Sequence, residues 1–473
     1  MAHLFISATR KSSGKTSIAV GLTAALARRG LAVQPFKKGP DFIDPLWLTR
    51  AAGKDCYNLD FFTQSAAEIL ATFSGKLTHA DIGVIEGNKG LFDGLDVGGV
   101  DSNAALATLL SAPVVLVIDS RGMTRGVAPL VRGYLDFDPD VDIRGVILNK
   151  VGGARHEAKL RGALERYTDV KVLGVMGHDP ALEIPERHLG LIPANEVNGA
   201  GNGSSTADSM IAGLADAVAA GVDLDRIIEI ADAANLPTVG TAPAAGSQGL
   251  IPDARPAVRI AFARDAAFGF YYPDDLEAFA DADAELIPFD ALRDPQLPEA
   301  DGLFIGGGFP ETQLSALAAN QSLLASIRRA LAKGMPAYAE CGGLMYLARS
   351  IRWRGETRRM VGAVPAEVIV CDRPQGRGYM VVEQTGNSPW PLSPTALTAG
   401  IPAHEFHYAR LENLPDDLAF AYRVVRGAGI DGRHDGIVIG NLLAAFGHHR
   451  NTEANPWVNR FVAFVREKSD RAA

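Results

Sequence analysis

The first half of the chain alternates short apolar runs with segments of helical periodicity. The apolar runs are continuous and rich in Val, Ile and Leu, which is typical of strands buried on both faces, and Ala and Leu recur at helical spacing in segments such as 17–28. Alternating strands and helices fold into a parallel sheet with helices on both faces. The predicted strands are Leu4–Ser7, Val33–Lys37, Ile82–Ile85, Val114–Ile118, Ile143–Leu148 and Val172–Val175.

A second series of strands and helices begins after residue 256. Val258–Ala263, Leu303–Ile305 and Pro336–Glu340 are predicted strands, and Pro456–Arg466 is a predicted final helix. Residues 239–256, between the two series, are rich in Gly, Pro, Ala and Ser, which is typical of a linker. We therefore predict an α/β protein of two domains, residues 1–240 and 257–473, joined by a linker at 241–256.

Composition excludes several classes of function. The 473 residues carry 46 Lys and Arg against 55 Asp and Glu, a net charge of −9, which argues against a nucleic-acid partner because phosphate binding depends on clustered cations. The three cysteines, Cys56, Cys341 and Cys371, are too few and too widely spaced for a disulfide framework, so a cytoplasmic location is expected. We expect no signal peptide and no membrane association, because no apolar run is long enough to cross a bilayer.

A phosphate-binding loop is predicted directly after the first strand. Residues 9–16 (TRKSSGKT) match the pattern G-x-x-x-x-G-K-[ST] at Gly14, Lys15 and Thr16, whereas Thr9 stands at the first glycine position. In such a loop backbone N–H groups bind phosphate, Lys15 reaches the β- and γ-phosphates, and the Thr16 hydroxyl can ligate Mg²⁺. The alternative is an exposed Ser/Lys turn before a helix.

Acidic residues follow two further strands of the same half. Asp41 and Asp44 lie in FKKGPDFIDP (36–45), and Glu86 and Asp93 lie in IEGNKGLFDG (85–94). Because the carboxyl ends of parallel strands meet at one edge of a sheet, these acids are expected to face the same nucleotide and its metal ion. Taken singly, each of them could equally be an ordinary turn residue.

The second half contains a candidate nucleophile, Cys341. The segment AYAECGGLMYL (337–347) predicts a strand, a sharp turn and a helix, and the helix N-terminus favours the thiolate. Gly307, in GGGFPE (306–311), and Gly342 offer backbone N–H groups for an oxyanion hole. His448 or His449 could serve as the base. The alternative for Cys341 is a buried, unreactive side chain.

The segment HEFHY (404–408) does not have the H-E-x-x-H spacing of a zinc protease, and the sequence suggests no third ligand. We therefore reject a metalloprotease and predict a loop that lines a substrate pocket or has only a structural role.

The motifs together resemble, in order and over nearly the whole chain, those of the cobyrinic acid a,c-diamide synthases. Besides the loops above, the resemblance is carried by PERHLGLIP (185–193), ARDAAFGFYYPDDLE (263–277), AECGGLMYL (339–347) and HEFHY. It implies a domain similar to dethiobiotin synthetase followed by a class I glutaminase domain of the triad type. It also implies ATP- and Mg²⁺-dependent amidation of the a and c acetates of a modified tetrapyrrole, through an acyl phosphate, with glutamine as nitrogen donor. A homodimer is compatible with the sequence.

The resemblance also implies roles for individual residues. It selects His448 over His449, because the family pattern A-S-Y-x-H-x-H places the catalytic histidine first. The implied sites are Cys341 and His448 for glutamine hydrolysis, Gly14, Lys15, Thr16 and Lys37 for ATP, Thr16, Asp41 and Glu86 for the metal, Asp93, Arg377 and Tyr379 for the substrate, and Gly307 and Gly342 for the oxyanion hole.

The chain departs from the family pattern at Ala445, Phe446 and Arg450, and in its phosphate-binding loop. These departures leave the reaction intact but open the choice of tetrapyrrole, so sirohydrochlorin or sirohaem is an alternative substrate. A hypothesis from a different class is a phosphate-loop switch ATPase whose second half is an inactive, glutaminase-like binding module.

Overall fold

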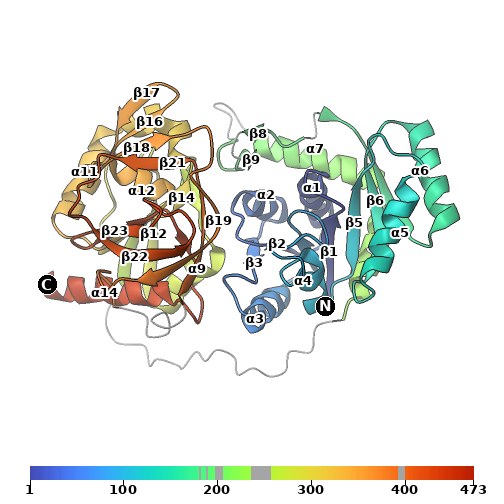
Figure 1. Ribbon diagram of the computed structural model, residues 1–473, viewed down its shortest axis with the longest axis horizontal. Helices are drawn as coiled ribbons and strands as arrows, with labels where there is room; N and C mark the ends of the chain where they lie inside the picture. The colour runs from blue at the N-terminus through green and yellow to red at the C-terminus, as the bar shows by residue number, and fades with distance from the viewer. Residues whose placement is uncertain (181–182, 188–189, 198–205, 236–256, 392–399, 473) are drawn as a thin grey trace. The chain divides into compact units, whose positions relative to one another are not determined.

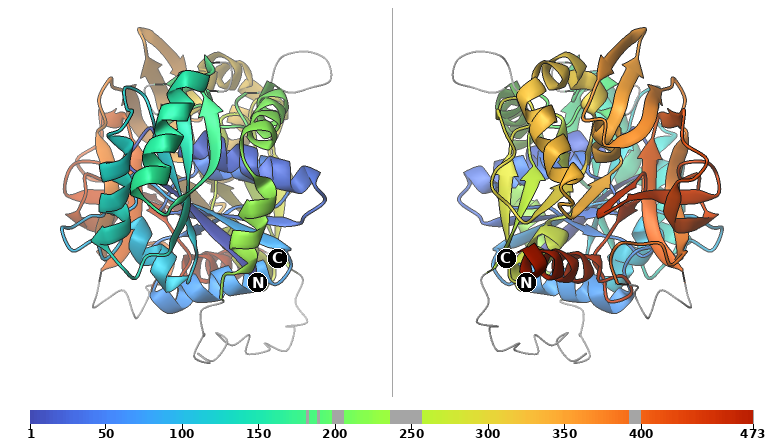
Figure 2. Two further views of the ribbon diagram at one scale, coloured as in Figure 1. Left: turned by 90° about the vertical axis from the view of Figure 1, so that its right-hand side faces the viewer. Right: turned by 90° about the vertical axis from the view of Figure 1, so that its left-hand side faces the viewer.

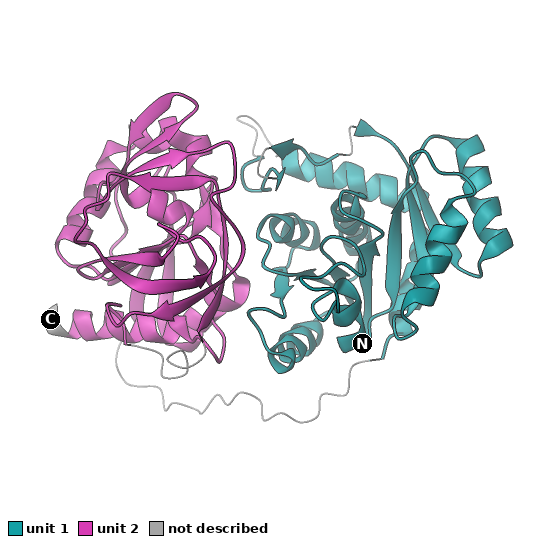
Figure 3. Ribbon diagram, viewed as in Figure 1, with its two compact units in different colours: residues 1–248 teal, residues 249–473 magenta. Residues whose placement is uncertain are grey.

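The computed structural model describes residues 1–180, 183–187, 190–197, 206–235, 257–391 and 400–472. The chain divides into two compact units, residues 1–248 and 249–473 (Figure 3). Each unit has its own sheets and its own hydrophobic core. The predicted linker at 241–256 lies outside the described residues.

Unit 1 is built on a seven-stranded parallel sheet with the strand order β3-β2-β4-β1-β5-β6-β7. All six predicted strands are confirmed, and a short strand at Tyr57–Leu59 is added at one edge. The strands are β1 (Ala2–Ala8), β2 (Val33–Lys38), β3 (Tyr57–Leu59), β4 (Ile82–Glu86), β5 (Val114–Asp119), β6 (Ile143–Val151) and β7 (Lys171–Gly177), with a separate pair β8 (Glu186–Arg187) and β9 (Gly190–Leu191).

Helices cover both faces of this sheet (Figure 1). Leu4 and Ile6 of β1 pack into the core layer under α1, α2, α7 and α8, whereas Phe5 packs into the opposite layer with α3, α4, α5 and α6. A strand whose alternate side chains are all apolar can be buried in this way only between two helical layers. The helices are α1 (Lys15–Arg28), α2 (Ile43–Ala52), α3 (Ala66–Leu77), α4 (Asn103–Leu109), α5 (Val127–Phe137), α6 (Ala154–Tyr167), α7 (Thr206–Gly221) and α8 (Leu224–Asp232).

Strand order brings the predicted loops of unit 1 together. β4 lies between β1 and β2, so the loops that follow these three strands leave the sheet side by side at its carboxyl edge. In the register of β2 and β4, Lys37 is paired with Glu86. The carboxyl edge of an open parallel sheet is where such folds bind their ligands.

Unit 2 contains a ten-stranded mixed sheet with the order β12-β10-β13-β15-β24-β23-β22-β19-β20-β25. The first five strands are parallel, and three of them, β10, β13 and β15, were predicted. The other five strands pair antiparallel with their neighbours. Their side chains alternate between buried and exposed positions, as in β20, so these strands lack the continuous apolar runs of parallel strands. The strands are β10 (Val258–Ala263), β12 (Ala284–Phe289), β13 (Gly302–Ile305), β15 (Ala337–Glu340), β19 (Gly376–Gln384), β20 (Ile401–His407), β22 (Ala419–Arg426), β23 (His434–Ile439), β24 (Leu442–Ala445) and β25 (His448–His449).

Helices also cover both faces of the parallel half of this sheet. α9 and α14, the long red helix of Figure 2, pack on one face, and α10, α11 and α12 pack on the other. The predicted final helix is confirmed and extends to Ala472. The helices are α9 (Pro273–Asp281), the 3₁₀ helix η2 (Pro310–Gln313), α10 (Leu314–Ala319), α11 (Gln321–Ala332), α12 (Gly342–Leu347) and α14 (Trp457–Ala472). The smaller sheets contain β11 (Phe268–Phe270) and β14 (Gly307–Gly308), and β16 (Ala348–Trp353), β17 (Glu356–Arg359), β18 (Val364–Val370) and β21 (Ala409–Glu412).

Candidate functional site

The turn between β1 and α1 is fixed by a side chain from β6. Ser12 and Gly14 have positive φ angles of 62° and 85°, and Gly14 is the N-cap of α1. The amide Nδ2 of Asn149 donates a hydrogen bond of 2.8 Å to the Ser13 carbonyl, and a Cβ atom at position 14 would lie 2.2 Å from this nitrogen. Glycine is therefore required at position 14, and the turn is held at a helix N-terminus, where proteins commonly bind phosphate.

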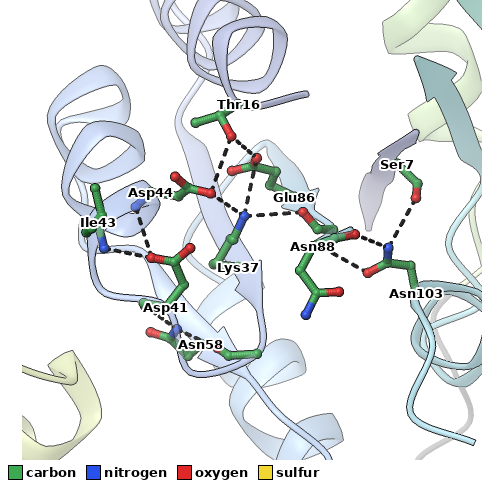
Figure 4. A network of polar contacts seen from close by, with 12 residues as sticks. Ser7, Thr16, Lys37, Asp41, Ile43, Asp44, Asn58, Glu86, Asn88 and Asn103 are labelled. Atoms are coloured by element: carbon green, nitrogen blue, oxygen red, sulfur yellow. Dashed lines mark hydrogen bonds and ion pairs between the residues drawn. The ribbon is translucent and has the colours of Figure 1, made fainter. Parts of the chain in front are cut away.

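Thr16, Lys37, Asp44 and Glu86 form a polar network beside this turn (Figure 4). The Thr16 hydroxyl donates to Glu86 Oε1 at 2.6 Å and lies 3.3 Å from Asp44 Oδ2. Lys37 Nζ lies 2.5 Å from Asp44 Oδ2 and 3.3 Å from Glu86 Oε1. The network therefore joins the start of α1 to the ends of β2 and β4.

The charges of this network set its pKa values. Burial alone would lower the pKa of Lys37, but the carboxylates of Asp44 and Glu86 outweigh it and raise that pKa. Burial alone would raise the pKa of Asp44, but the Lys37 charge outweighs burial and lowers that pKa. Burial lowers the pKa of Lys15, and the Lys37 charge lowers it further. A polyphosphate beside Lys15 would supply the negative charge that favours its cationic form.

The two acids of the loop after β2 have different surroundings. Asp41 Oδ1 accepts hydrogen bonds from the backbone N–H groups of Ile43, at 2.8 Å, and Asp44, at 3.3 Å, which are the first two residues of α2. Burial, followed by the charge of Asp44, raises the pKa of Asp41 to about 7. The structure thus places Asp44, rather than the predicted Asp41, in contact with Thr16 and Lys37.

The loop after β4 folds back against the phosphate-binding turn. Leu91 N–H donates to the carbonyl of Ala8 at 2.8 Å. Asp93 Oδ2 accepts a hydrogen bond of 2.9 Å from Gly90 N–H, and Asn103 Nδ2 donates to the Gly90 carbonyl at 2.8 Å. Asp93, which was predicted to handle substrate, therefore also closes the turn that brings this loop beside β1.

Two oxygen atoms of the network suit a magnesium ion. Thr16 Oγ1 and Glu86 Oε1 are 2.6 Å apart, and the second carboxylate oxygen of Glu86 is buried without a hydrogen-bond partner. Mg²⁺ is usually held by one or two protein oxygens together with waters and substrate phosphates. Within the described part of the chain, no three His, Cys, Asp or Glu side chains are arranged as a metal site. A Mg²⁺ ion here would therefore depend on nucleotide oxygens.

Cys341 lies at a strained turn between β15 and α12. Its φ and ψ angles are 46° and −100°, and its side chain is 6% exposed. Its backbone N–H donates to the Ala445 carbonyl at 2.7 Å. A Cβ atom at position 343 would lie 2.2 Å from the carbonyl oxygen of Ile305, so α12 can approach β13 this closely only with glycine there. A nucleophile elbow needs such a turn, because it holds the nucleophile at the end of the sheet.

His448, on β25, is the histidine beside the Cys341 thiol. Its Nδ1 lies 3.3 Å from Oε2 of Glu340. Burial would lower the pKa of His448, but its interactions with Cys341 and Glu340 outweigh burial and raise that pKa to about 10. The ring of His449 contacts Tyr422 instead, with centroids 4.9 Å apart, and burial lowers its pKa to about 4. The geometry therefore favours His448 as the partner of Cys341.

The predicted oxyanion loop packs against both the histidine and the elbow. A Cβ atom at position 307 would lie 2.4 Å from Cε1 of His448, and one at position 342 would lie 2.8 Å from the carbonyl oxygen of Gly308. The structure thus brings together the four residues predicted for glutamine hydrolysis, namely Cys341, His448, Gly307 and Gly342.

We expect Gly307→Ala to lower glutamine-dependent amidation by about 10²-fold, because the added methyl group must displace the His448 ring. Amidation with ammonia should be unchanged, since this contact lies within unit 2. Steady-state rates with each nitrogen donor measure both effects. Gly162→Ala, where an added Cβ atom meets nothing within 4 Å, is the matched control. Wild-type activity of Gly307→Ala with glutamine would contradict the expectation.

Two predicted substrate residues lie on β19, one strand away from His448. Tyr379 pairs with His404 of β20, and His404 pairs with His448 of β25. The ring centroids are 6.4 Å apart in the first pair and 6.3 Å apart in the second. The exposed guanidinium of Arg377 lies 5.9 Å from the ring centroid of Phe406. Residues 404–407 of the HEFHY segment therefore belong to a strand beside the candidate glutaminase site, and the prediction that the segment is a loop is wrong.

Glu340 and Asn149 take part in these sites but were not predicted. Both follow short apolar runs, at the end of β15 and within β6. A polar residue that ends a buried run at the ligand-binding edge of a sheet is a usable signal for both. Asp44 was predicted together with Asp41 as an acid of the loop after β2. The sequence could not show that Asp44 contacts Thr16 whereas Asp41 binds the backbone N–H of Ile43.

Comparison with known proteins assigns a class to each unit. Residues 4–192 match the family described as the CobQ/CobB/MinD/ParA nucleotide binding domain. Residues 259–456 match the family described as the CobB/CobQ-like glutamine amidotransferase domain. A nucleotide-binding unit and a glutamine amidotransferase unit in one chain define a glutamine-dependent amide ligase.

Three curated relatives named cobyrinate a,c-diamide synthase align along nearly their full length. The protein of Magnetococcus marinus is 47% identical and covers 98% of this chain and 97% of its own. The protein of Methanosarcina acetivorans is 40% identical and covers 94% of this chain and 92% of its own. The protein of Archaeoglobus fulgidus is 39% identical and covers 98% of each chain. The chain belongs to the cobyrinate a,c-diamide synthase family, and it is a carbon–nitrogen ligase with glutamine as its nitrogen donor.

In the described ranges, no helix combines the length and the apolar character that a bilayer span requires.

Proposed function

We propose that this protein uses ATP and glutamine to amidate the a and c acetate side chains of a modified tetrapyrrole of the cobyrinate or hydrogenobyrinate type. Residues 1–240 would form the amide synthase domain and residues 257–473 the glutaminase domain, with 241–256 as linker. The observation that carries the proposal is that a chain similar along its whole length to cobyrinate a,c-diamide synthases retains both sets of chemically competent residues.

The carboxylate must be activated, because oxide is too poor a leaving group for direct attack by ammonia. A substrate carboxylate oxygen attacks the γ-phosphorus of ATP, ADP leaves, and an acyl phosphate forms. Ammonia then attacks the acyl carbon, phosphate leaves, and the amide remains once a proton has been lost. Each acetate amidated therefore consumes one ATP and one glutamine.

The residues of unit 1 suit the transfer of the γ-phosphoryl group. Phosphoryl transfer is accelerated mainly by positioning and by neutralisation of charge. Lys15 would contact the phosphates from the start of α1, while Lys37 holds Asp44 and Glu86 in place. Thr16 and Glu86 would hold Mg²⁺, which when bound neutralises phosphate charge.

The residues of unit 2 suit the release of ammonia from glutamine. The Cys341 thiol gives its proton to His448 as the sulfur attacks the amide carbon, and His448 returns that proton to the leaving ammonia. Backbone N–H groups of Gly307 and Gly342 would stabilise the oxyanion of the tetrahedral intermediate. Water then hydrolyses the thioester to glutamate.

A tetrapyrrole with acetate side chains needs cations beside apolar or aromatic surface. Arg377 and Tyr379 supply this mixture in unit 2. Arg187, on β8, adds a cation in unit 1, where it forms an ion pair with Glu196. His188, the residue after Arg187, lies outside the described residues.

The test is mass spectrometry of the purified protein with ATP, Mg²⁺, glutamine and each of hydrogenobyrinic acid, cobyrinic acid, sirohydrochlorin and sirohaem. We expect one or two amides on hydrogenobyrinic or cobyrinic acid, each seen as the replacement of a hydroxyl by an amino group. Amidation of sirohydrochlorin or sirohaem alone would move the substrate to that branch of the family. ATP hydrolysis without amidation and without glutamine hydrolysis would instead favour the switch ATPase.

A further inference from the structure

The residue directly before the nucleophile contacts the candidate catalytic histidine. Glu340 is the last residue of β15, and its Oε2 lies 3.3 Å from Nδ1 of His448. The side chain of Glu340 is 5% exposed and that of His448 is 3% exposed. The Cε1–Nε2 edge of the His448 ring lies against the oxyanion loop, since Cε1 and Nε2 are the atoms that a Cβ at position 307 would meet.

The Glu340 carboxylate is held in place by its other oxygen. Oε1 accepts a hydrogen bond of 2.6 Å from the hydroxyl of Tyr338 and one of 3.0 Å from the backbone N–H of His449. β15 and β24 are parallel, and their register pairs Glu340 with Ala445, so the carboxylate lies beside the segment that leads to His448. Oε2 is therefore directed at the imidazole by two hydrogen bonds to Oε1 and by the pairing of β15 with β24.

The position two residues after the histidine cannot supply this contact. It is occupied by Arg450, where the family pattern has a second histidine, and its guanidinium binds Oδ2 of Asp274 at 2.6 and 3.1 Å. Arg450 is a cation, so it could not accept the Nδ1 proton of His448 in a hydrogen bond.

We infer that Glu340 is the positioning residue of the glutaminase and completes a Cys341–His448–Glu340 triad whose acid comes from the elbow strand. Glu340 accepts the Nδ1–H of His448, which leaves Nε2 to take the thiol proton, and it stabilises the imidazolium that this transfer creates. The inference rests on the proposed roles of Cys341 and His448.

The charges around His448 agree with this role. The titratable groups that face it are Cys341, Glu340, His404 and His449. Burial lowers the pKa of His404 to about 3 and that of His449 to about 4, so both rings are neutral near pH 7. At His448 burial acts in the same direction, but Cys341 and Glu340 outweigh it and raise the pKa to about 10. Loss of the Glu340 charge should therefore lower that pKa.

The test is Glu340→Gln, which keeps the size of the side chain and an oxygen for Tyr338 but removes the charge. We expect glutamine-dependent amidation to fall by on the order of 10²–10⁴-fold, with amidation by ammonia unchanged. The alkaline limb of the pH profile of kcat/KM for glutamine should move to lower pH, because the imidazolium of His448 loses its proton sooner. Glu340→Asp should keep the limb closer to its wild-type position.

Asp435→Asn is the matched control. Asp435 is also a buried carboxylate of unit 2, and it accepts hydrogen bonds of 2.9 Å from the N–H groups of Phe446 and Gly447. The largest contributions that raise the pKa of His448 come from Cys341 and Glu340 and not from Asp435. Its replacement can loosen the segment before His448 without changing the charge on Nδ1, so the alkaline limb should not move.

Three outcomes would overturn the inference. These are a loss below about threefold with glutamine in Glu340→Gln, an equal loss with ammonia, and an equal shift of the alkaline limb in Asp435→Asn. Wild-type glutamine use by Cys341→Ala would instead defeat the proposed glutaminase itself, whatever the result at Glu340.

Discussion

Lys15→Ala is expected to abolish amide synthesis with glutamine and with ammonia alike. In the proposed mechanism both nitrogen donors attack the same activated carboxylate, and activation requires transfer of the γ-phosphoryl group. Lys15 is 8% exposed at the start of α1, and burial together with the Lys37 charge lowers its pKa. Its charge is therefore costly until a polyphosphate approaches. Losing it should cost on the order of 10²–10³-fold in rate.

The measurement is the initial rate of amide formation with each nitrogen donor, together with glutamine hydrolysis in the same preparation. Glutamine hydrolysis should survive in Lys15→Ala, because Cys341 and His448 belong to unit 2. Lys159→Ala removes an equally charged but exposed side chain of unit 1 and should behave as wild type. Ammonia-dependent turnover above about a tenth of the wild-type rate would contradict the phosphate-loop assignment.

The sequence could predict the parallel sheets because their strands are buried on both faces. Val114–Asp119 is buried throughout and reads as a strand without any tertiary information. β3, at Tyr57–Leu59, was missed because three residues are too few to show a period. In unit 2, β22 (AFAYRVVR) mixes exposed arginines with apolar residues, so only its partners β19 and β23 define it as a strand.

The candidate sites, too, could be predicted only where consecutive residues carry the signal. Gly14, Lys15, Cys341 and Gly342 lie in local turns whose chemistry is visible in consecutive residues. Glu340 could not be matched to His448, which is 108 residues later, because their contact depends on the register between β15 and β24 and on the turn after β24. Sequence spacing therefore predicts nucleophiles and phosphate loops more readily than the side chains that orient them.

Cys341→Ala is expected to abolish amidation with glutamine while leaving amidation with ammonia near the wild-type rate. In the proposed mechanism the thioester forms on the Cys341 sulfur, so the loss with glutamine should be on the order of 10⁴-fold or more. The residues proposed to activate the carboxylate are in unit 1, and the proposal gives them no role in forming that thioester. Alanine should fit the turn as well as cysteine does, because both residues have a Cβ atom and would adopt the same positive φ.

Cys371→Ala provides the matched control and should keep both activities. Cys371 is a half-buried free thiol of the same unit. It contacts the backbone of Ile369 and the guanidinium of Arg410.

Rates would be measured at saturating glutamine and then at increasing ammonium concentration, at a pH high enough to supply free ammonia. If Cys341→Ala loses both activities equally while its thermal unfolding is unchanged, the two reactions are not separable by nitrogen donor, and a scheme in which unit 2 only supplies ammonia is wrong. If it loses neither, another group releases the ammonia, and the strained turn at Cys341 requires a different explanation.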